Sequence, residues 1–308
     1  MSRFLGPEFV RGAGGLLALA LVLALPASAA ASFPGRNGQV AAADRQTDRA
    51  GSTDALSLYS RRGGLIRQVA SCGPNEGLPE AIRGCPADPA FSPSGSQLAF
   101  DVDGRLAVGS ATGKGVRTLP RLTERDGDPH WSPSGDRLVF TGLRAGRVDL
   151  YLVRPDGTGL QRLTHAGGRA AAWSRRGTIA FVRRGAVYRL NPAHGGPRRV
   201  ARGGYPDWSP SGRSLLYQRL GRTYLIATDR RRAHRRLVRR DALRPVFSPD
   251  GRRLLFLRVV PADRFSGDLS VYTAPLGGGA ARVLIRGGEL EAGSVFDSFR
   301  ELAWQPIR

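Results

Sequence analysis

Trp131-Ser132-Pro133-Ser134-Gly135 is the clearest of five copies of one short phrase: an aromatic residue, Ser, usually Pro, a small or acidic residue, and Gly. The other four copies begin at Phe91, Trp173, Trp208 and Phe247, and a degenerate sixth, Trp304-Gln305-Pro306, lies near the C-terminus. Successive aromatic residues are 40, 42, 35, 39 and 57 residues apart. A period of about 40 residues predicts a repeat architecture.

Each repeat contains the signals of four short strands. Pro fixes the first corner of a tight turn, and Gly accepts the positive φ that closes it. An apolar strand follows, as in Arg137–Phe140, and the next strand carries a recurring Tyr such as Tyr151. Short strands separated by regular turn signals predict an antiparallel blade. In one copy Arg175-Arg176 replaces Pro and Ser, and we expect a looser turn there.

Four copies also carry a proline two residues before the aromatic, as in Asp128-Pro129-His130-Trp131. The pattern resembles the TolB-like, WD40-like (PD40) β-propeller repeat, and the resemblance covers residues 33–308. It implies an all-β propeller of four-stranded antiparallel blades. Counting the repeats and the incomplete end strands predicts a six-bladed β-propeller, and a seventh blade would need a hidden repeat in the long last segment. Gln39–Ala42 indicates a second strand without a first, whereas Leu302–Pro306 indicates a first strand without a second. Pairing residues 302–306 with the N-terminal blade completes the ring and removes its free edge.

The expected blades are 37–87 with 302–306, 88–127, 128–168, 169–204, 205–243 and 244–301. Ahead of them, Arg3 and Arg11 form a basic region that precedes an apolar core, Leu16–Leu25. Pro26 and the small residues Ala27-Ser28-Ala29 follow the core. This order is typical of a secretory signal peptide. We expect residues 1–30 to be removed and the propeller, 31–308, to be extracytoplasmic. The alternative is an uncleaved anchor, which is the one case in which we expect membrane attachment.

The two cysteines, Cys72 and Cys85, bracket a loop rich in Gly and Pro. In an exported chain such a pair predicts a disulfide. Two thiols without a nearby His are too few ligands for a structural metal. We therefore assign no metal site and no cofactor.

The formal net charge is +22, and Lys114 is the only lysine. One interpretation is attraction to an acidic partner; the other is a composition bias that placed Arg at solvated positions throughout the repeats. The densest basic run contains Arg230, Arg231, Arg232, Arg235 and Arg236. It could bind a polyanion or be a solvated hairpin. Because no aromatic residues interleave with it, a nucleic-acid partner is not expected.

Four long connections are expected on one face of the ring, at 44–54, 71–87, 260–267 and 286–300. They belong to the first and last blades, which are neighbours once the ring closes. Long loops on a rigid scaffold often carry function, although a closure point can also tolerate insertions. The candidate binding residues of this face are Asp128, His130, His165, Glu289, Glu291, Asp297, Arg300 and Glu301.

Function remains a choice between two classes. The first is a non-enzymatic scaffold, expected to be monomeric, that binds a protein or an anionic cell-envelope polymer. The alternative is a propeller enzyme, such as a metal-dependent polysaccharide lyase or a glycan hydrolase, with Asp128, His130 and His165 near the channel mouth. No G-x-S-x-G nucleophile motif is present in the sequence, and we assign no catalytic residue.

Overall fold

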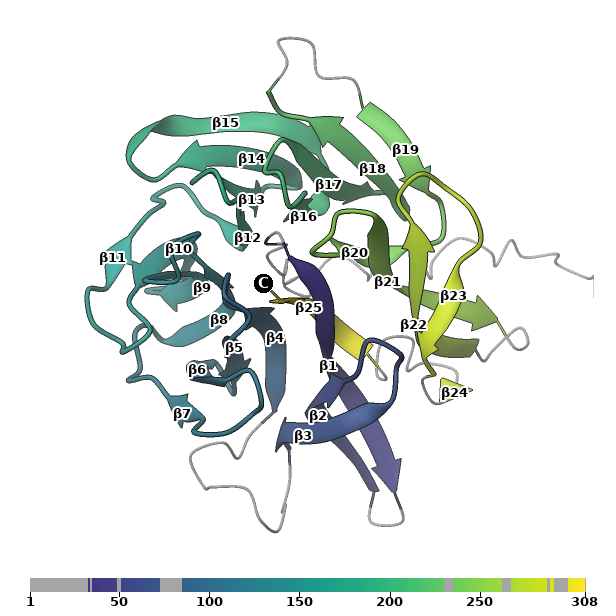
Figure 1. Ribbon diagram of the computed structural model, residues 1–308. Coiled ribbons are helices and arrows are strands. Elements are labelled where there is room, and N and C mark those ends of the chain that lie inside the picture. Colours follow the sequence, from purple (N-terminus) through teal and green to yellow (C-terminus); the bar gives the residue numbers. More distant parts are fainter. Residues whose placement is uncertain are drawn as a thin grey trace, which may run out of the picture.

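The computed structural model describes residues 33, 35–48, 51–72, 85–229, 235–261, 267–286, 289–290 and 299–307. The expected signal peptide, 1–30, lies outside this range. The described chain forms six antiparallel sheets arranged as blades around a central axis (Figure 1). Within this range there is no helix long and apolar enough to cross a bilayer.

The strands follow one another blade by blade. The second blade contains β4 (Pro86–Phe91), β5 (Gln97–Val102), β6 (Arg105–Ser110) and β7 (Arg117–Thr118). The third contains β8 (Arg125–Trp131), β9 (Leu138–Arg144), β10 (Arg147–Val153) and β11 (Gln161–Arg162). The fourth contains β12 (Arg169–Trp173), β13 (Ile179–Arg183), β14 (Ala186–Asn191) and β15 (His194–Arg202).

The fifth blade contains β16 (Gly204–Trp208), β17 (Ser214–Arg219), β18 (Arg222–Ala227) and β19 (Arg235–Arg239). The sixth contains β20 (Leu243–Phe247), β21 (Arg253–Pro261), β22 (Gly267–Pro275), β23 (Arg282–Ile285) and a short addition, β24 (Glu289–Leu290), on β22. The first blade is made of β25 (Phe299–Ile307), β1 (Arg36–Asp48), β2 (Gly51–Tyr59) and β3 (Leu65–Ser71). The predicted all-β, six-bladed propeller is confirmed.

The ring closes where β25 pairs antiparallel with β1, and Val40 lies opposite Trp304. We call this pairing the seam. Gln305 Nε2 donates to the carbonyl oxygen of Gly95 in the second blade over 2.7 Å. Asn37 Nδ2 donates to Asp250 Oδ2 in the sixth blade over 3.1 Å. The seam is therefore bonded to both neighbouring blades, and the predicted closure by the C-terminal strand is confirmed.

The repeated phrase closes a turn with the same kinds of hydrogen bond in five blades. In the third blade Ser132 Oγ accepts from Arg137 N over 3.0 Å, and Gly135 N donates to Ser132 O over 3.0 Å. The fourth blade lacks the proline, yet Ser174 Oγ accepts from Thr178 N over 3.1 Å and Gly177 N donates to Ser174 O. The expectation of a looser turn was wrong, because this turn is one residue shorter and closes with the same bonds.

The aromatic residue of the phrase packs blade against blade. Trp131 and Trp208 are buried. The Trp131 indole Nε1 donates to Ala90 O of the preceding blade over 2.9 Å, and Trp208 Nε1 donates to Ala172 O over 3.1 Å. These two residues combine a large buried apolar surface with a satisfied polar group, which suits them to an inter-blade interface.

Candidate functional site

The hairpins between the second and third strands divide the blades into two kinds. Blades 2 to 5 use two-residue turns in which both residues have positive φ, the geometry that suits a tight hairpin. These turns are Asp103-Gly104, Ala145-Gly146, Arg184-Gly185 and Leu220-Gly221. In blades 1 and 6 the same hairpins are longer: β1 has 13 residues, and β2, β21 and β22 have 9 each.

We call the outer ends of these two hairpins the seam ribbons; their described residues are 45–48 with 51–54, and 258–261 with 267–270. In the first ribbon β1 and β2 stay paired out to Asp48 opposite Gly51. β25 stops pairing with β1 at Asp44, and β3 stops pairing with β2 at Ala55. Among the described residues, the first ribbon is thus two-stranded, because neither β25 nor β3 accompanies it beyond these positions.

The second ribbon is built in the same way. β21 and β22 pair out to Pro261 opposite Gly267, whereas β20 stops pairing with β21 at Leu257. β24 covers part of the other edge by pairing with Gly267 and Asp268. In Figure 1 both ribbons extend outward from the adjacent first and sixth blades.

The predicted disulfide is present and lies on the same face. Cys72 and Cys85 are bonded, with their Cα atoms 4.4 Å apart. Cys72 follows β3 and Cys85 precedes β4, so the bond joins the first blade to the second. Asp103 Oδ1 also accepts from Cys85 N over 2.9 Å. The residues between 73 and 84 lie outside the described range.

Asp128 and His130 are buried in the wall of the ring. Thr141 Oγ1 donates to Asp128 Oδ2 over 2.8 Å and in turn accepts from Ala170 N of the fourth blade over 3.2 Å. His130 Nδ1 accepts from Trp173 N, also in the fourth blade, over 3.1 Å. Both side chains therefore take part in hydrogen bonding that joins the third blade to the fourth.

The other candidate residues are dispersed. His165 is exposed and its carbonyl oxygen accepts from Arg147 Nη2 over 3.3 Å. Glu289 belongs to β24, and Arg300 and Glu301 belong to β25. Glu291 and Asp297 lie outside the described residues. Within the described part of the chain, no group of three or more His, Cys, Asp and Glu residues could hold a metal ion.

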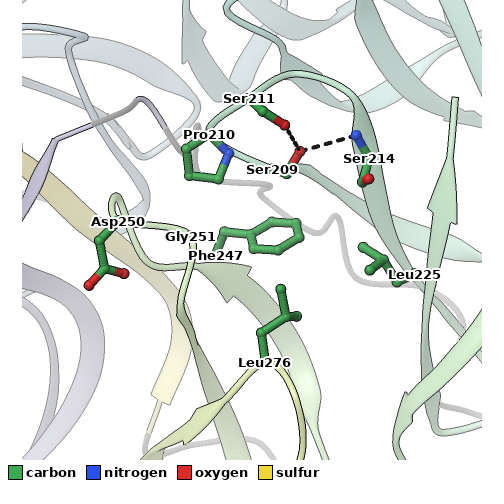
Figure 2. Close-up of a pocket in the computed structure, with 9 residues that line it drawn as sticks. All are labelled: Ser209, Pro210, Ser211, Ser214, Leu225, Phe247, Asp250, Gly251 and Leu276. Atoms are coloured by element: carbon green, nitrogen blue, oxygen red, sulfur yellow. Dashed lines mark hydrogen bonds between the residues drawn. The ribbon is translucent and has the colours of Figure 1, made fainter. Parts of the chain in front are cut away.

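A groove of about 330 Å³ lies on the opposite face, between the repeated turns of blades 5 and 6 (Figure 2). Buried Phe247 contributes to its lining. Ser209 Oγ is within 3.1 Å of Ser211 Oγ and accepts from Ser214 N. Asp250 accepts from Ser248 Oγ over 2.5 Å. These polar groups are used to close turns, and none of the lining residues is a histidine or lysine that could act as a base.

The comparisons with known proteins bear on the fold. No family model and no curated protein matches the chain. Among solved structures, TolB from Acinetobacter baumannii is 20% identical, with a TM-score of 0.64, over 89% of this chain and 68% of that one. A candidate TolB from Agrobacterium tumefaciens is 18% identical, with a TM-score of 0.60, over 89% and 99% of the two chains. Hydrazine synthase from Kuenenia stuttgartiensis is 12% identical, with a TM-score of 0.63, over 89% and 47%.

The fold is that of a TolB-like propeller. Identities at or below 20% show the fold alone, and differently named proteins such as TolB and hydrazine synthase share it, so function has to be argued from this chain's own surfaces.

Sequence reasoning overlooked the distribution of acidic residues. Arg235 and Arg236 of the predicted basic run are exposed on β19, whereas Arg230, Arg231 and Arg232 lie outside the described residues. A wider feature surrounds this run. Residues 169–204, the fourth blade, contain nine Arg and no Asp or Glu. The sequence does carry this signal, in the absence of Asp and Glu from residues 169–204. A search for runs of positive residues does not detect such an absence.

Proposed function

We propose that this protein is an exported, non-enzymatic propeller that binds a protein partner through the seam ribbons. The observation that carries the proposal is the pair of two-stranded ribbons on adjacent blades. Unpaired strand edges are ready templates for a further strand, and natural proteins normally keep them short or covered. Blades 2 to 5 follow that rule with two-residue turns. The extension of both ribbons at one place therefore supports a binding role.

Strand addition explains how such ribbons would recognise a partner. An extended segment of the partner would pair with β1 beyond Asp44 or with β21 beyond Leu257, along edges that no described strand covers. Backbone hydrogen bonds would supply affinity, and alternate side chains would supply specificity. The disulfide on the same face joins blades 1 and 2 and supports export, since such bonds persist in oxidising compartments.

The enzyme alternative would use Asp128, His130 and His165. Asp128 and His130 accept hydrogen bonds from Thr141 Oγ1 and Trp173 N inside the wall of the ring, whereas His165 is exposed. The burial of the first two residues and their bonds to neighbouring structure suit an inter-blade role.

Two shortened variants test the proposal. In the first, Asn-Gly replaces residues 45–54 and joins Asp44 to Ala55, which already face each other across the hairpin. In the second, Asn-Gly replaces residues 260–268 and joins Val259 to Leu269, which are also paired. The control replaces Ala145-Gly146 of the third blade with Asn-Gly, because both positions already have positive φ.

The readout is quantitative cross-linking in the native cell envelope, followed by titration of the purified partner. We expect a protein that is captured by the wild type and by the control but not by at least one shortened variant, with Kd weakened at least about tenfold, or 1.4 kcal/mol. Thermal unfolding would verify that each variant is folded. If both shortened variants are folded and bind the partner as tightly as the wild type, the proposal is overturned.

A further inference from the structure

Positive charge is concentrated in two neighbouring blades. Residues 169–204 contain nine Arg and no acid, and residues 205–243 contain ten Arg and three Asp. Together, these 75 residues carry +16 of the formal charge of +22. Blades 2 and 3, residues 88–168, carry ten basic and nine acidic residues. We call the described residues of this stretch, 169–229 and 235–243, the basic sector.

A composition bias does not account for this difference. Such a bias acts on every repeat of one gene alike, and blades 2 and 3 have the same architecture as blades 4 and 5. Arginines are present in all of them, but those of blades 2 and 3 are matched by acids. Arg162, for example, pairs with the buried Asp149 over 2.5 Å in the third blade. The fourth blade has no acid that could form such a pair. The fifth has three, and one of them, Asp241, pairs with Arg239 over 3.0 Å.

The arginines of the fourth blade occupy three sides of it. Arg175 and Arg176 are exposed on the turn between its first two strands, and Arg184 is exposed on the hairpin at the other face. The outer strand β15 exposes Arg198, Arg199 and Arg202. The positive surface therefore runs from one face of the ring, over its rim, to the other face.

Part of this charge is held at a cost. Arg189 and Arg198 lie directly opposite each other on β14 and β15, and like charges at such positions are destabilising. Arg189 Nη1 donates to Thr228 O of the fifth blade over 2.8 Å. Within the described part of the chain, no ion pair involves an arginine of the fourth blade. A folded protein that retains unfavourable charge without ion pairs has a site that suits an external anion.

The aromatic residues of the sector argue against nucleic acid. Tyr188 stacks on Phe181 with ring centroids 5.8 Å apart, and the Arg183 guanidinium lies 4.1 Å from its centroid. Tyr224 is engaged in the same way by Tyr217 at 5.5 Å and Arg235 at 5.3 Å. A surface that binds single strands needs open aromatic faces for the bases, and these two rings are already engaged.

We propose that the basic sector binds an extended, flexible, phosphate-rich polymer of the cell envelope. A flat bilayer would contact one face of the ring, whereas a flexible chain can follow the arginines from face to face across the rim. Guanidinium groups bind phosphate through paired N–H donors, which suits a polymer with a phosphate in every repeat. This surface is separate from the seam ribbons, so the inference does not depend on the protein-binding function proposed above.

The test measures binding of long-chain inorganic polyphosphate by the purified propeller over a series of salt concentrations. The variant R198S/R199S/R202S removes three exposed charges from β15. The matched control, R105S/R144S/R154S, removes three exposed arginines from blades 2 and 3. Each phosphate contact contributes somewhat less than one to the slope of log K against log salt. We expect the β15 variant to bind at least tenfold more weakly and to lose about two from that slope.

The control should bind within about twofold of the wild type if location matters more than net charge. If both triple variants weaken polyphosphate binding equally, the proposal is overturned, because binding would then depend on net charge and not on the position of the arginines. Single-stranded DNA or phosphatidylglycerol vesicles that bind as tightly as polyphosphate at equal salt would also overturn it. A second variant, R175S/R176S, repeats the test on an exposed turn if the β15 variant does not fold. Shortening the seam ribbons should leave polyphosphate binding unchanged, which keeps the two proposals separable.

Discussion

Blades 1 and 6 and blades 4 and 5 elaborate the same repeat in different ways. In blades 1 and 6 the hairpins are longer and form two-stranded ribbons. Their charges are nearly balanced: residues 37–87 contain six Arg and five acidic residues, and residues 244–301 contain eight Arg and seven acidic residues. Blades 4 and 5 keep two-residue turns and change their side chains instead. A propeller can thus acquire separate surfaces in separate sectors without altering the sheets beneath them.

The largest effect should come from the seam. Trp304 is 5% exposed and lies opposite Val40 on β1. Replacing a buried Trp with Ala typically costs about 3–5 kcal/mol. We expect Trp304→Ala to lower the free energy of unfolding by this amount, measured by urea denaturation. Arg144→Ala, at an exposed position of the third blade, should change it by less than about 0.5 kcal/mol. A small loss in Trp304→Ala would mean that the seam does not limit the stability of the ring.

The disulfide should come next. Cys72 and Cys85 are 13 residues apart, and closing a loop of that size restricts the unfolded chain by about 3 kcal/mol. We expect the double variant C72S/C85S to unfold at a correspondingly lower urea concentration. Adding reductant to the wild type should reproduce the shift and leave the variant unchanged. An unchanged unfolding midpoint in both cases would show that the disulfide does not stabilise the protein.

In blades 2 and 3, where acidic and basic residues are nearly equal in number, stability should depend on pH through individual carboxyl groups. The fourth blade has no carboxyl side chain that could contribute such an effect. Burial raises the pKa of Asp126, although its carboxylate accepts from Thr123 Oγ1 over 2.6 Å and from Leu122 N over 3.1 Å. Because the folded pKa lies above the unfolded value, its contribution to stability is present below pH 3.8 and is lost as the pH rises through the folded pKa.

Asp126→Asn should therefore flatten the fall in stability on the alkaline side of pH 3.8, measured by urea denaturation at a series of pH values. Asp156 provides the opposite sign: hydrogen bonds from Thr158 N and Thr158 Oγ1 lower its pKa. Its contribution is present above pH 3.8 and is lost as the pH falls through the folded pKa, so Asp156→Asn should lower stability at neutral pH and flatten its fall on the acid side. Identical pH profiles for the wild type and Asp126→Asn would refute the first assignment.

The smallest effect tests the cost of the basic sector. Arg198→Glu places a carboxylate opposite Arg189 on the neighbouring strand. Exchanging a like pair for an opposite pair at such a position should stabilise the protein by roughly 0.2–1 kcal/mol. The gain should shrink at high salt, where surface charges are screened. Arg154→Glu in the third blade has no such opposing arginine and serves as the control. A loss of stability in Arg198→Glu would show that the arginine pair is not repulsive.

Much of the fold could be predicted because it is encoded locally. The five turn phrases number the blades, and the incomplete strands at 39–42 and 302–306 predict the closure. The pairing of β24 with β22 follows no periodic signal, and the shortened turn at Ser174 depends on which backbone groups meet. Both are settled by three-dimensional contacts that a local pattern does not encode.

The site was less predictable for the same reason. His130 carries a side chain that is common in metal sites, but its burial and its bond to Trp173 N depend on the neighbouring blade. The long connections at 44–54 and 260–267 were located by sequence, although their form as paired ribbons was not foreseen. The basic sector could have been found from the sequence by counting acids in each repeat, because residues 169–204 contain none.

The register of the seam has a mechanical consequence. Arg36, at the start of β1, lies opposite Ile307, at the end of β25. A force that separates these two ends acts across the ladder, so the hydrogen bonds between the strands, which run perpendicular to them, break in succession. A ring that is closed by this pairing can therefore be unzipped by a small tension on these two ends. A force that separates two neighbouring blades would instead have to break many packing contacts at once.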